Sequence, residues 1–472
     1  MGFYFMIKKR IYLWKGSVAM KKRAFIISLL VALLVTICVG CGGKEPESII
    51  PTFADRTNVE EFKNVPLMET KGNYFPVEDY GSKNYVAHIT ESTLDEYKAY
   101  LNRMESAGFK KHSDNLKDGM EGYAYTASFT KENLTVTVSY SVLMNHTYIS
   151  ASYDMPLSDH LFYKDSYVKD KKKDKTKVHM LQMLESQGAS FIIELKNGHF
   201  VVYDGGLKQE TENFLKTLKE LTPAGEKPVI EAWFLSHCHN DHYGPIMQIS
   251  QDQTLLDQVY VNGFYYVEPS AALFKRLKTQ PDPVGNEKIL NAFTMFKTQD
   301  GVAPEVYRPA LGQRYYFCDI MIDVSFTLEQ IPYNQYRGTD FNDTSTWLMT
   351  HIDGQRMLYG GDAGKDSTLM SVKMFDKKYL DMDIFITFHH GINVYDQLTE
   401  VSTYDVVLYA SFRAGSLWDS RADLAAVPQN DRLKAKAQEV LHHGDGSVTL
   451  TFPYKIGTAE IGEDWQDNYT LM

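Results

Sequence analysis

The sequence is poor in cysteine, carries no excess of positive charge and contains no internal repeat. Only four of its 472 residues are cysteine, and two of them, Cys38 and Cys41, lie together near the N-terminus. Cys238 and Cys318 are too few to form a disulfide framework. The net charge of −11 provides no overall basic surface for a long nucleic acid, whose phosphates dominate binding. The absence of a repeat excludes a solenoid or propeller array.

The N-terminal segment combines a basic start with an apolar run. Met20 is followed by three basic residues, then by residues 24–39, an apolar stretch of signal-peptide length, and by Cys41 between glycines. The segment resembles a bacterial lipoprotein signal, although Cys38 stands where an aliphatic residue is usual. The resemblance implies that Cys41 is the lipidated first residue of the mature chain, attached to the cytoplasmic membrane. An uncleaved transmembrane anchor is the alternative, but residues 24–39 are short for a span of about 20 residues.

Either reading places the rest of the chain on the extracellular face of a bacterial cell envelope. Residues 1–41 carry seven basic and no acidic side chains, so their removal changes the net charge from −11 to −18. Such a surface repels polyanions and disfavours nucleic acid as a partner. Lys275, Arg276 and Lys278 form either a local basic groove or, as the simpler reading, a solvated helix face.

Length alone suggests two or three domains after the signal, and the sequence places one break between two folded parts. The expected order is signal peptide 1–41, tether 42–60, small α+β domain 61–165, charged linker 166–177 and large α/β domain 178–472. The linker contains a lysine-rich run with no apolar residue to bury. The small domain contains no catalytic constellation, so we expect it to act in spacing, packing or partner binding.

The small domain has a clear helix start followed by alternating strand patterns. Thr93 and Glu96 form a capping box before a helix that ends near Gly108. Leu94, Tyr97, Leu101 and Met104 share one face of this helix. Strands are expected at 123–129, 134–143 and 148–153.

The large domain contains a dense group of metal-binding side chains. Residues 230–235 predict a strand, and the sequence His237-Cys238-His239-Asn240-Asp241-His242 follows it directly. A strand delivers successive side chains to opposite faces, so these ligands can share a centre only on a tight loop. Three of the 14 histidines beside an Asp are not expected by chance. Imidazoles with a carboxylate suit Zn(II), and two such ions can hold a hydroxide between them at neutral pH.

Three further strand-like runs end in acidic residues, histidines or glycines. Residues 357–362 end in Gly-Gly-Asp, which makes Asp362 a candidate carboxylate between two metals. Residues 383–391 end in His389, His390 and a glycine; the place before the glycine favours His390 as the ligand and His389 as a rim residue. Residues 199–206 end in Asp204 and two glycines, and Asp204 is expected to orient the loop ligands.

These candidate ligands and the strands before them, in this order along the chain, resemble the metallo-β-lactamase superfamily over roughly residues 178–455. The resemblance implies an αββα sandwich with two divalent metals at one edge, and the ligand chemistry favours Zn for them. It assigns His237 and His239 to the first metal, Asp241 and His242 with a downstream histidine to the second, and Asp362 to both. Asp204 matches an early Asp of the superfamily that is mainly structural.

Within that superfamily the sequence is most similar to the hydrolase domain of bacterial competence (DNA-uptake) channel proteins. The matching features are Asn342 to Ser345 before an apolar strand, the His-His-Gly run, and residues 444–450 as a closing strand. Asn342 and Asp343 occupy the place where most members of the superfamily supply a third histidine to the first metal. An amide is a poor zinc ligand, so the first ion is expected to be weakly held, more hydrated, or a harder ion such as Mn(II). His351 is the only histidine nearby, at the far end of the strand.

Metal-assisted hydrolysis is the mechanism that these residues predict. A metal-bridging hydroxide attacks, the metals stabilise developing charge, and Asp241 orients the nucleophile or accepts its proton. The competence-like features favour a phosphodiester-type substrate of small or medium size. One alternative is a nuclease in DNA uptake or scavenging, which would need a basic groove. Another is a non-catalytic surface binding module on a metallo-β-lactamase scaffold, whose first metal site has degenerated. The oligomeric state is open.

Periodicity predicts mixed strands and helices throughout the large domain. Strands are expected at 178–184, 190–195, 199–203, 229–235, 257–261, 321–327, 345–350, 356–360, 383–388, 405–409 and 447–452. Helices are expected near 208–220, 241–250, 270–279, 285–297, 366–374 and 430–440.

Overall fold

The computed structural model describes residues 50–81, 83–169, 171–183, 188–277, 285–331, 341–392, 395–410 and 427–462. The chain divides into residues 1–49 and a compact unit, Ile50–Met472, which contains every described residue. The predicted lipoprotein signal with Cys41, and Lys278 of the candidate basic groove, lie outside the described residues. Among the helices that the structure describes, none is both long and apolar enough to cross a membrane.

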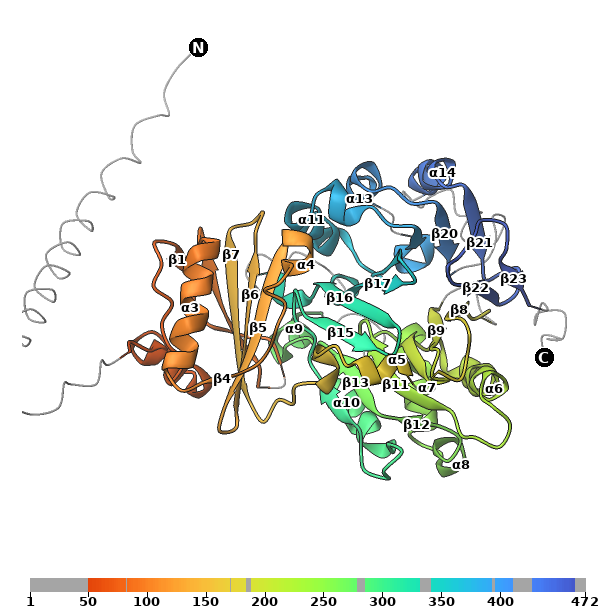
Figure 1. The fold of residues 1–472 in the computed structure, drawn as a ribbon, viewed down its shortest axis with the longest axis horizontal. Coiled ribbons are helices and arrows are strands. Elements are labelled where there is room, and N and C mark those ends of the chain that lie inside the picture. The colour runs from red at the N-terminus through yellow and green to blue at the C-terminus, as the bar shows by residue number, and fades with distance from the viewer. Residues whose placement is uncertain are drawn as a thin grey trace, which may run out of the picture. The chain divides into compact units, whose positions relative to one another are not determined.

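An antiparallel sheet forms the N-terminal part of this unit (Figure 1). Its strand order is β1-β3-β7-β6-β5-β4, with β2 paired to β3. The strands are β1 (Asn73–Tyr74), β2 (Glu78–Asp79), β3 (Tyr85–Thr90), β4 (Lys110–Asp114), β5 (Ala124–Lys131), β6 (Leu134–Ser141) and β7 (His146–Tyr153). The accompanying helices are η1 (Phe53–Asp55), α2 (Glu60–Lys63), α3 (Leu94–Ser106) and α4 (Gly119–Gly122). Side chains of α3 and of the sheet share one hydrophobic core.

Helix α3 begins as predicted. The hydroxyl of Thr93 accepts a hydrogen bond from the Glu96 amide at 3.2 Å, and the Glu96 carboxylate accepts one from the Thr93 amide at 2.8 Å. The three predicted strands correspond to β5, β6 and β7, although His146, expected in a turn, begins β7. The polar sequence of β4 gives no strand signal, and it is a strand because it pairs with β5. The domain boundary at 166–177 stays a prediction.

Two larger sheets form the rest of the unit. The first has the order β14-β13-β11-β10-β9-β8-β22-β23, with β12 paired to β11. Its strands are β8 (Lys177–Met180), β9 (Ser190–Glu194), β10 (Phe200–Asp204), β11 (Val229–Leu235), β12 (Tyr260–Val261), β13 (Gly263–Tyr266), β14 (Glu305–Tyr307), β22 (Val448–Thr451) and β23 (Glu460–Ile461). The second has the order β15-β16-β17-β18-β19-β20-β21. Its strands are β15 (Arg314–Phe317), β16 (Ile320–Phe326), β17 (Trp347–Ile352), β18 (Gln355–Tyr359), β19 (Ile384–Ile386), β20 (Val406–Tyr409) and β21 (Glu439–His442).

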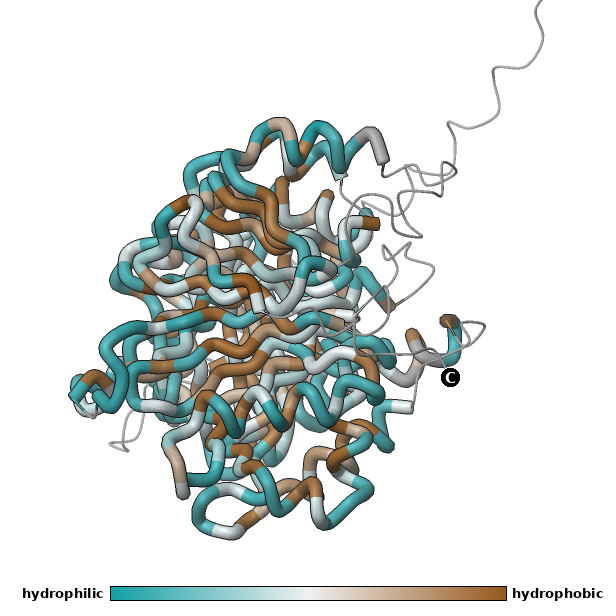
Figure 2. The backbone as a smooth tube through the Cα atoms, turned by 90° about the vertical axis from the view of Figure 1, so that its right-hand side faces the viewer, coloured by the Kyte–Doolittle hydropathy of each residue, from teal (hydrophilic) through white to brown (hydrophobic). Residues whose placement is uncertain are grey.

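These two sheets share one hydrophobic core, and a second core joins their other faces to helices. On β11, Ala232 and Phe234 belong to the shared core, whereas Trp233 and Leu235 belong to the core beneath the helices. Burial on both faces explains why the strand reads as a continuous apolar run. Figure 2 shows this pattern as hydrophobic segments along the central strands and hydrophilic stretches on the outer helices.

Helices α11, α13 and α14 lie on one side of these strands, and α6, α7, α8 and α10 lie on the other (Figure 1). The helices of this part are η2 (Asp159–Leu161), α5 (Asp165–Lys169), η3 (Lys208–Glu210), α6 (Thr211–Leu221), α7 (Asn240–Ile249), α8 (Gln253–Leu256), α9 (Ala271–Leu277), α10 (Asn286–Met295), η4 (Leu328–Gln330), η5 (Asn342–Thr344), α11 (Lys365–Met374), α12 (Lys377–Leu380), η6 (Phe388–Gly391), α13 (Asp396–Val401) and α14 (Val427–Lys436). The chain is therefore a mixed α/β protein with several sheets. The helix expected to reach residue 440 ends at Lys436, because the chain continues into β21, which pairs with β20.

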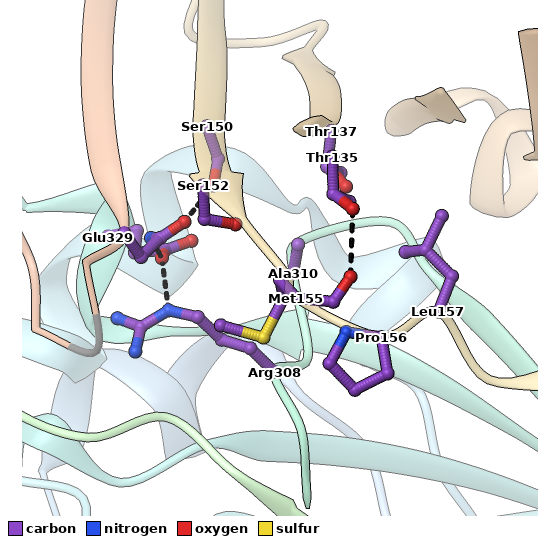
Figure 3. A pocket seen from close by; sticks show the side chains of 11 residues that line it. Thr135, Thr137, Ser150, Ser152, Met155, Pro156, Leu157, Arg308, Ala310 and Glu329 are labelled. Carbon is purple, nitrogen blue, oxygen red and sulfur yellow. Dashed lines mark hydrogen bonds and ion pairs between the residues drawn. The ribbon is translucent and has the colours of Figure 1, made fainter. Parts of the chain in front are cut away.

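Polar side chains join the N-terminal sheet to the larger sheets. The Glu329 carboxylate accepts hydrogen bonds from Asn84 at 2.5 Å and from the Arg308 guanidinium at 2.8 Å. Beside them lies a cavity of about 20 Å3 that Ser150 and Ser152 also line (Figure 3). Its size and polar walls suit a single ordered water. The contact is therefore a packed, specific one, but it offers no room for a substrate.

Candidate metal centre

The candidate ligands lie where parallel strands end. Strand β10 is parallel to β11, and β18, β19 and β20 are parallel to one another. Asp204 ends β10, His237 follows β11, and Asp362 follows β18. Because parallel strands present their carboxyl ends at one edge of a sheet, side chains distant in sequence meet there.

The first ligands lie on a sharp turn between β11 and α7, as the sequence predicted. His239 is the N-cap of α7 with extended backbone angles, φ −94° and ψ 153°. Asp241 and His242 lie in the first turn of the helix, where the helix dipole favours a carboxylate. Cys238 points into a hydrophobic core, and burial raises the pKa of its thiol to about 12. Cys238 is therefore a packing residue of this core and belongs to neither group of potential ligands.

A close backbone contact places α7 beside the loop after β10. The Gly244 amide donates a hydrogen bond to the Gly206 carbonyl at 3.0 Å. A Cβ atom at Gly244 would lie 2.1 Å from the backbone nitrogen of Lys208. Only glycine permits this approach, which brings His242 to Asp204.

Asp204 connects the loop ligands through hydrogen bonds. Its carboxylate accepts bonds from His242 Nδ1 at 2.6 Å, from the Ser236 amide and hydroxyl at 2.7 Å each, and from the Tyr359 hydroxyl. The Ser236 oxygen in turn accepts a bond from His237 Nδ1 at 3.0 Å. With their Nδ1 atoms engaged in this way, His237 and His242 direct Nε2 at the cluster, as metal-binding imidazoles do.

Two groups of potential ligand atoms share Asp362. His237, His239 and Asp362 form the first group, and Asp241, His242, Asp362 and His390 form the second. Within each group all ligand atoms lie within 4.8 Å of one another. The structure thus brings together every residue that the resemblance assigned to the two metals. His389, expected at the rim, and Asn342, which stands in place of a third histidine, are members of neither group.

The separations within the second group fit a metal ion. Two ligands of a tetrahedral zinc ion, each about 2.0 Å from it, lie roughly 3.3 Å apart. Nε2 of His242 lies 3.1 Å and Nε2 of His390 lies 3.5 Å from Asp362 Oδ1. Although both are buried, His242 Nε2 and Asp362 Oδ1 have no hydrogen-bond partner among the atoms that the structure describes. A cation between them would satisfy both, so the residues fit the group that the sequence implies.

Charges within the cluster shift the pKa values of its members. Burial opposes the charged form of His390, but Asp362 and Asp241 outweigh it and raise the pKa of His390 to about 9. At His242 the charges of Asp362 and Asp204 likewise outweigh burial, and the pKa of the imidazole lies well above its usual value. Burial, with two neighbouring histidines, lowers the pKa of His237. Burial would raise the pKa of the Asp241 and Asp362 carboxyls, but the neighbouring histidines outweigh burial and hold both pKa values below the usual value. Both carboxylates are therefore ionised and available to a cation.

The His-His-Gly run has an unusual backbone. His389 has φ 50° and ψ 48°, and His390 has φ 55° and ψ 20°, so both lie in the left-handed region. For residues other than glycine such conformations cost of order 1–3 kcal/mol each and cluster at functional sites. The Nδ1 of His390 donates to the Ala410 carbonyl at 3.0 Å, which leaves its Nε2 facing Asp241 at 3.1 Å. Consecutive histidines of an extended strand would point to opposite faces, but this backbone is not extended.

The region before β17 holds the Asp362 loop in place. Asn342 and Asp343 are buried in η5. Asp343 accepts hydrogen bonds from the Ser367 amide and hydroxyl, both at 2.9 Å, in the first turn of α11. The Asp362 amide donates to the Ser345 hydroxyl at 3.1 Å. Asp343 and Ser345 therefore position the loop that carries Asp362.

His351 does not lie at the centre. It lies near the far end of β17, and its Nε2 is 3.2 Å from the Asp323 carboxylate. Arg314 binds the same carboxylate at 2.6 and 2.9 Å. His351 thus belongs to a separate ion-pair cluster.

Three residues of the centre, Ser236, Tyr359 and Ser345, were not predicted from the sequence. Ser236 precedes His237, and this adjacency is the only signal that sequence offers for it. Tyr359 reads as one apolar residue of a buried strand, because nothing local indicates that its hydroxyl reaches Asp204. The two glycines before Asp362 permit close packing against other parts of the protein. A Cβ atom at Gly360 would lie 2.4 Å from the Phe388 ring, and one at Gly361 would lie 2.5 Å from the Ser236 hydroxyl.

Comparison with known proteins yields weak likenesses only. No family model matches the chain, and no curated protein matches it. A metallo-beta-lactamase with a HARLDQ motif from Cronobacter sakazakii is 13% identical, with a TM-score of 0.26 over 48% of this chain and 82% of that one. The metallo-beta-lactamase fold protein YhfI from Bacillus subtilis is 12% identical, with a TM-score of 0.31 over 57% and 97%. A flavodiiron protein from Giardia intestinalis is 11% identical, with a TM-score of 0.24 over 43% and 42%. These scores are too low to assign a family, so the function has to be inferred from the ligand geometry.

Proposed function

We propose that this protein is a metal-dependent hydrolase with two divalent cations, of the kind found in the metallo-β-lactamase superfamily. The observation that carries the proposal is the position of Asp362, which belongs to both ligand groups. A shared carboxylate between two nitrogen-rich groups is the arrangement that a binuclear hydrolytic centre needs. The helices outside two sheets with a common core support an αββα sandwich as the fold.

The cations, when bound, would lower the pKa of water and polarise the oxygen of a scissile bond. The residues of the chain supply the rest. Asp241, at the start of α7, is ionised and placed to orient the attacking water or to accept its proton. Asp204 and Ser236 keep the imidazoles of His242 and His237 in the orientation that directs Nε2 at the centre. No side-chain nucleophile is required.

A phosphodiester-type substrate is the class we favour, with zinc as the metal. The run from Asn342 to Ser345 and the His-His-Gly sequence resemble the hydrolase domain of competence proteins and support this choice. A net charge of −18 without residues 1–41 argues against a long polyanion and for a small or medium ester. With Cys41 as a lipid anchor, the enzyme would act on substrates of the cell envelope or the medium.

A hydrolysis screen with parallel metal analysis tests this proposal. The purified protein is assayed against phosphodiester, phosphomonoester, lactone, β-lactam and single-stranded DNA substrates, with metal content measured by mass spectrometry. We expect two metals per chain and turnover of a small phosphodiester that a chelator abolishes and zinc restores. Cleavage of DNA with a steep salt dependence would instead favour the nuclease. Two bound metals with no turnover of any substrate would favour a binding module.

A further inference from the structure

We propose that His389 is a ligand of the first metal and supplies the histidine that is missing at Asn342. The inference rests on the proposed function, because it concerns how the same centre binds its cations. The first group contains three protein ligands, His237, His239 and Asp362, whereas the second contains four. With His389 as a fourth ligand of the first metal, both metals would have four protein ligands.

The two oxygens of Asp362 face two different pairs of histidines. Oδ1 lies 3.1 Å from Nε2 of His242 and 3.5 Å from Nε2 of His390. Oδ2 lies 3.8 Å from Nε2 of His237 and 3.7 Å from Nε2 of His389. His389 therefore stands toward Oδ2 of Asp362 as His390 stands toward Oδ1. Each oxygen, with its pair of imidazoles, outlines one metal position.

The strained backbone of the His-His-Gly run produces this arrangement. Consecutive residues of an extended strand would send their side chains to opposite faces. With both residues left-handed, His389 and His390 instead reach the same carboxylate from two sides, their ring planes inclined by 66° and their centroids 6.0 Å apart. The His389 amide also donates to the Gly361 carbonyl at 3.1 Å, which fixes it beside Asp362. One imidazole is thus available to each metal.

The chemistry of the donors favours the same assignment. His351, the other histidine near Asn342 in sequence, is held by Asp323 at 3.2 Å. An imidazole binds zinc better than the Asn342 amide does. His389 is about one-fifth exposed, whereas His390 is almost completely buried. We infer that the first metal lies on the more open side of the centre and is nitrogen-rich, which suits Zn(II) rather than a harder ion.

Zinc titration of the purified full-length protein against a chromophoric chelator tests this inference. His389→Asn is the informative variant, since Asn tolerates the left-handed backbone and its side chain is too short to replace Nε2. We expect two tight zinc sites in the unaltered protein. In His389→Asn one site should weaken by more than the roughly 100-fold that loss of a supporting contact costs. His389→Gly, which fits the same backbone, repeats the test should the first variant fold poorly.

Double variants identify which metal is affected. If His389 and His239 bind the same ion, replacing both with Asn leaves the other site tight. Replacing both His389 and His390 removes both tight sites. His351→Asn, the matched control outside the centre, should keep two tight sites.

Two results would overturn the assignment: unchanged affinity for both zincs in His389→Asn, or loss of both tight sites in the His389 and His239 double variant. Absence of tight zinc binding in the unaltered protein would reject the metal centre itself, and so the proposed function. The two failures are therefore distinguishable.

Discussion

Replacement of Asp204 by Asn tests how the centre is organised. One Asp204 oxygen accepts hydrogen bonds from Ser236 Oγ, His242 Nδ1 and Tyr359, and the other accepts one from the Ser236 amide. An amide nitrogen in place of either oxygen would face donors only. The Ser236 and Tyr359 hydroxyls can rotate to accept from the amide, but the Ser236 backbone N–H cannot accept. His242 Nδ1 can accept only in the tautomer that places the proton on Nε2, which removes Nε2 as a metal ligand.

The expected loss of stability follows from these contacts. A buried hydrogen bond to a charged group contributes about 1.5–3 kcal/mol, and either placement of the amide nitrogen removes one such bond, so the expected loss is about 1.5–3 kcal/mol. A protein with about 5–15 kcal/mol of stability remains folded at 25 °C after such a loss, but much less securely. Because the imidazole of His242 loses its orienting carboxylate, zinc affinity should fall about 10–100-fold.

Urea unfolding of the metal-free protein and zinc titration measure the two effects. Asp353→Asn is the matched control: Asp204 and Asp353 are both left-handed, at φ 55° and 46°, but Asp353 pairs at the surface with Lys196 at 3.0 Å. That exposed pair should contribute less than about 1 kcal/mol. If Asp204→Asn matched the unaltered protein in both measurements, Asp204 would not organise the centre.

Three further predictions address packing, pH dependence and anchoring. Gly244→Ala should lower the free energy of urea unfolding by at least about 2 kcal/mol, because a Cβ atom there would lie 2.1 Å from backbone, whereas Gly285→Ala, which meets nothing within 4 Å, should change it little. Burial would raise the pKa of Asp323, but Arg314 outweighs burial and lowers it. The Asp323 carboxylate therefore stabilises the folded protein fully above its unfolded pKa of about 4. This stabilisation is lost as the pH falls through the lower pKa of the folded state. Asp323→Asn should therefore make urea stability less dependent on pH below about 4; an unchanged slope would contradict this. Cys41→Ser should release the protein from the membrane fraction, and unchanged attachment would instead indicate an uncleaved helix.

Local sequence signals predicted much of the fold correctly. Strand β11 has the predicted bounds, because both of its faces are buried and its apolar run is uninterrupted. The capping box placed the start of α3. Strand β4 was missed because its residues are polar, and β21 was partly assigned to the preceding helix. Both are strands through pairing with neighbours, which a local pattern does not contain.

In the metal centre, too, sequence spacing reveals some residues, whereas others depend on how the strands pair. His237, His239, Asp241 and His242 are close in sequence, so their spacing alone reveals a metal site. The position of His389 depended on two consecutive left-handed residues, which no sequence pattern signals. The contacts of Ser236 and Tyr359 with Asp204 join three separate strand ends and are visible only once the strands are paired.

Anomalous diffraction at the zinc absorption edge, from crystals of the zinc-loaded protein, would locate both cations in one experiment. We expect two zinc peaks about 3.5–4 Å apart, as in other two-metal sites, with one beside each oxygen of Asp362. No zinc peak near Asp362, or a single peak with no second ion on its other side, would contradict a binuclear centre.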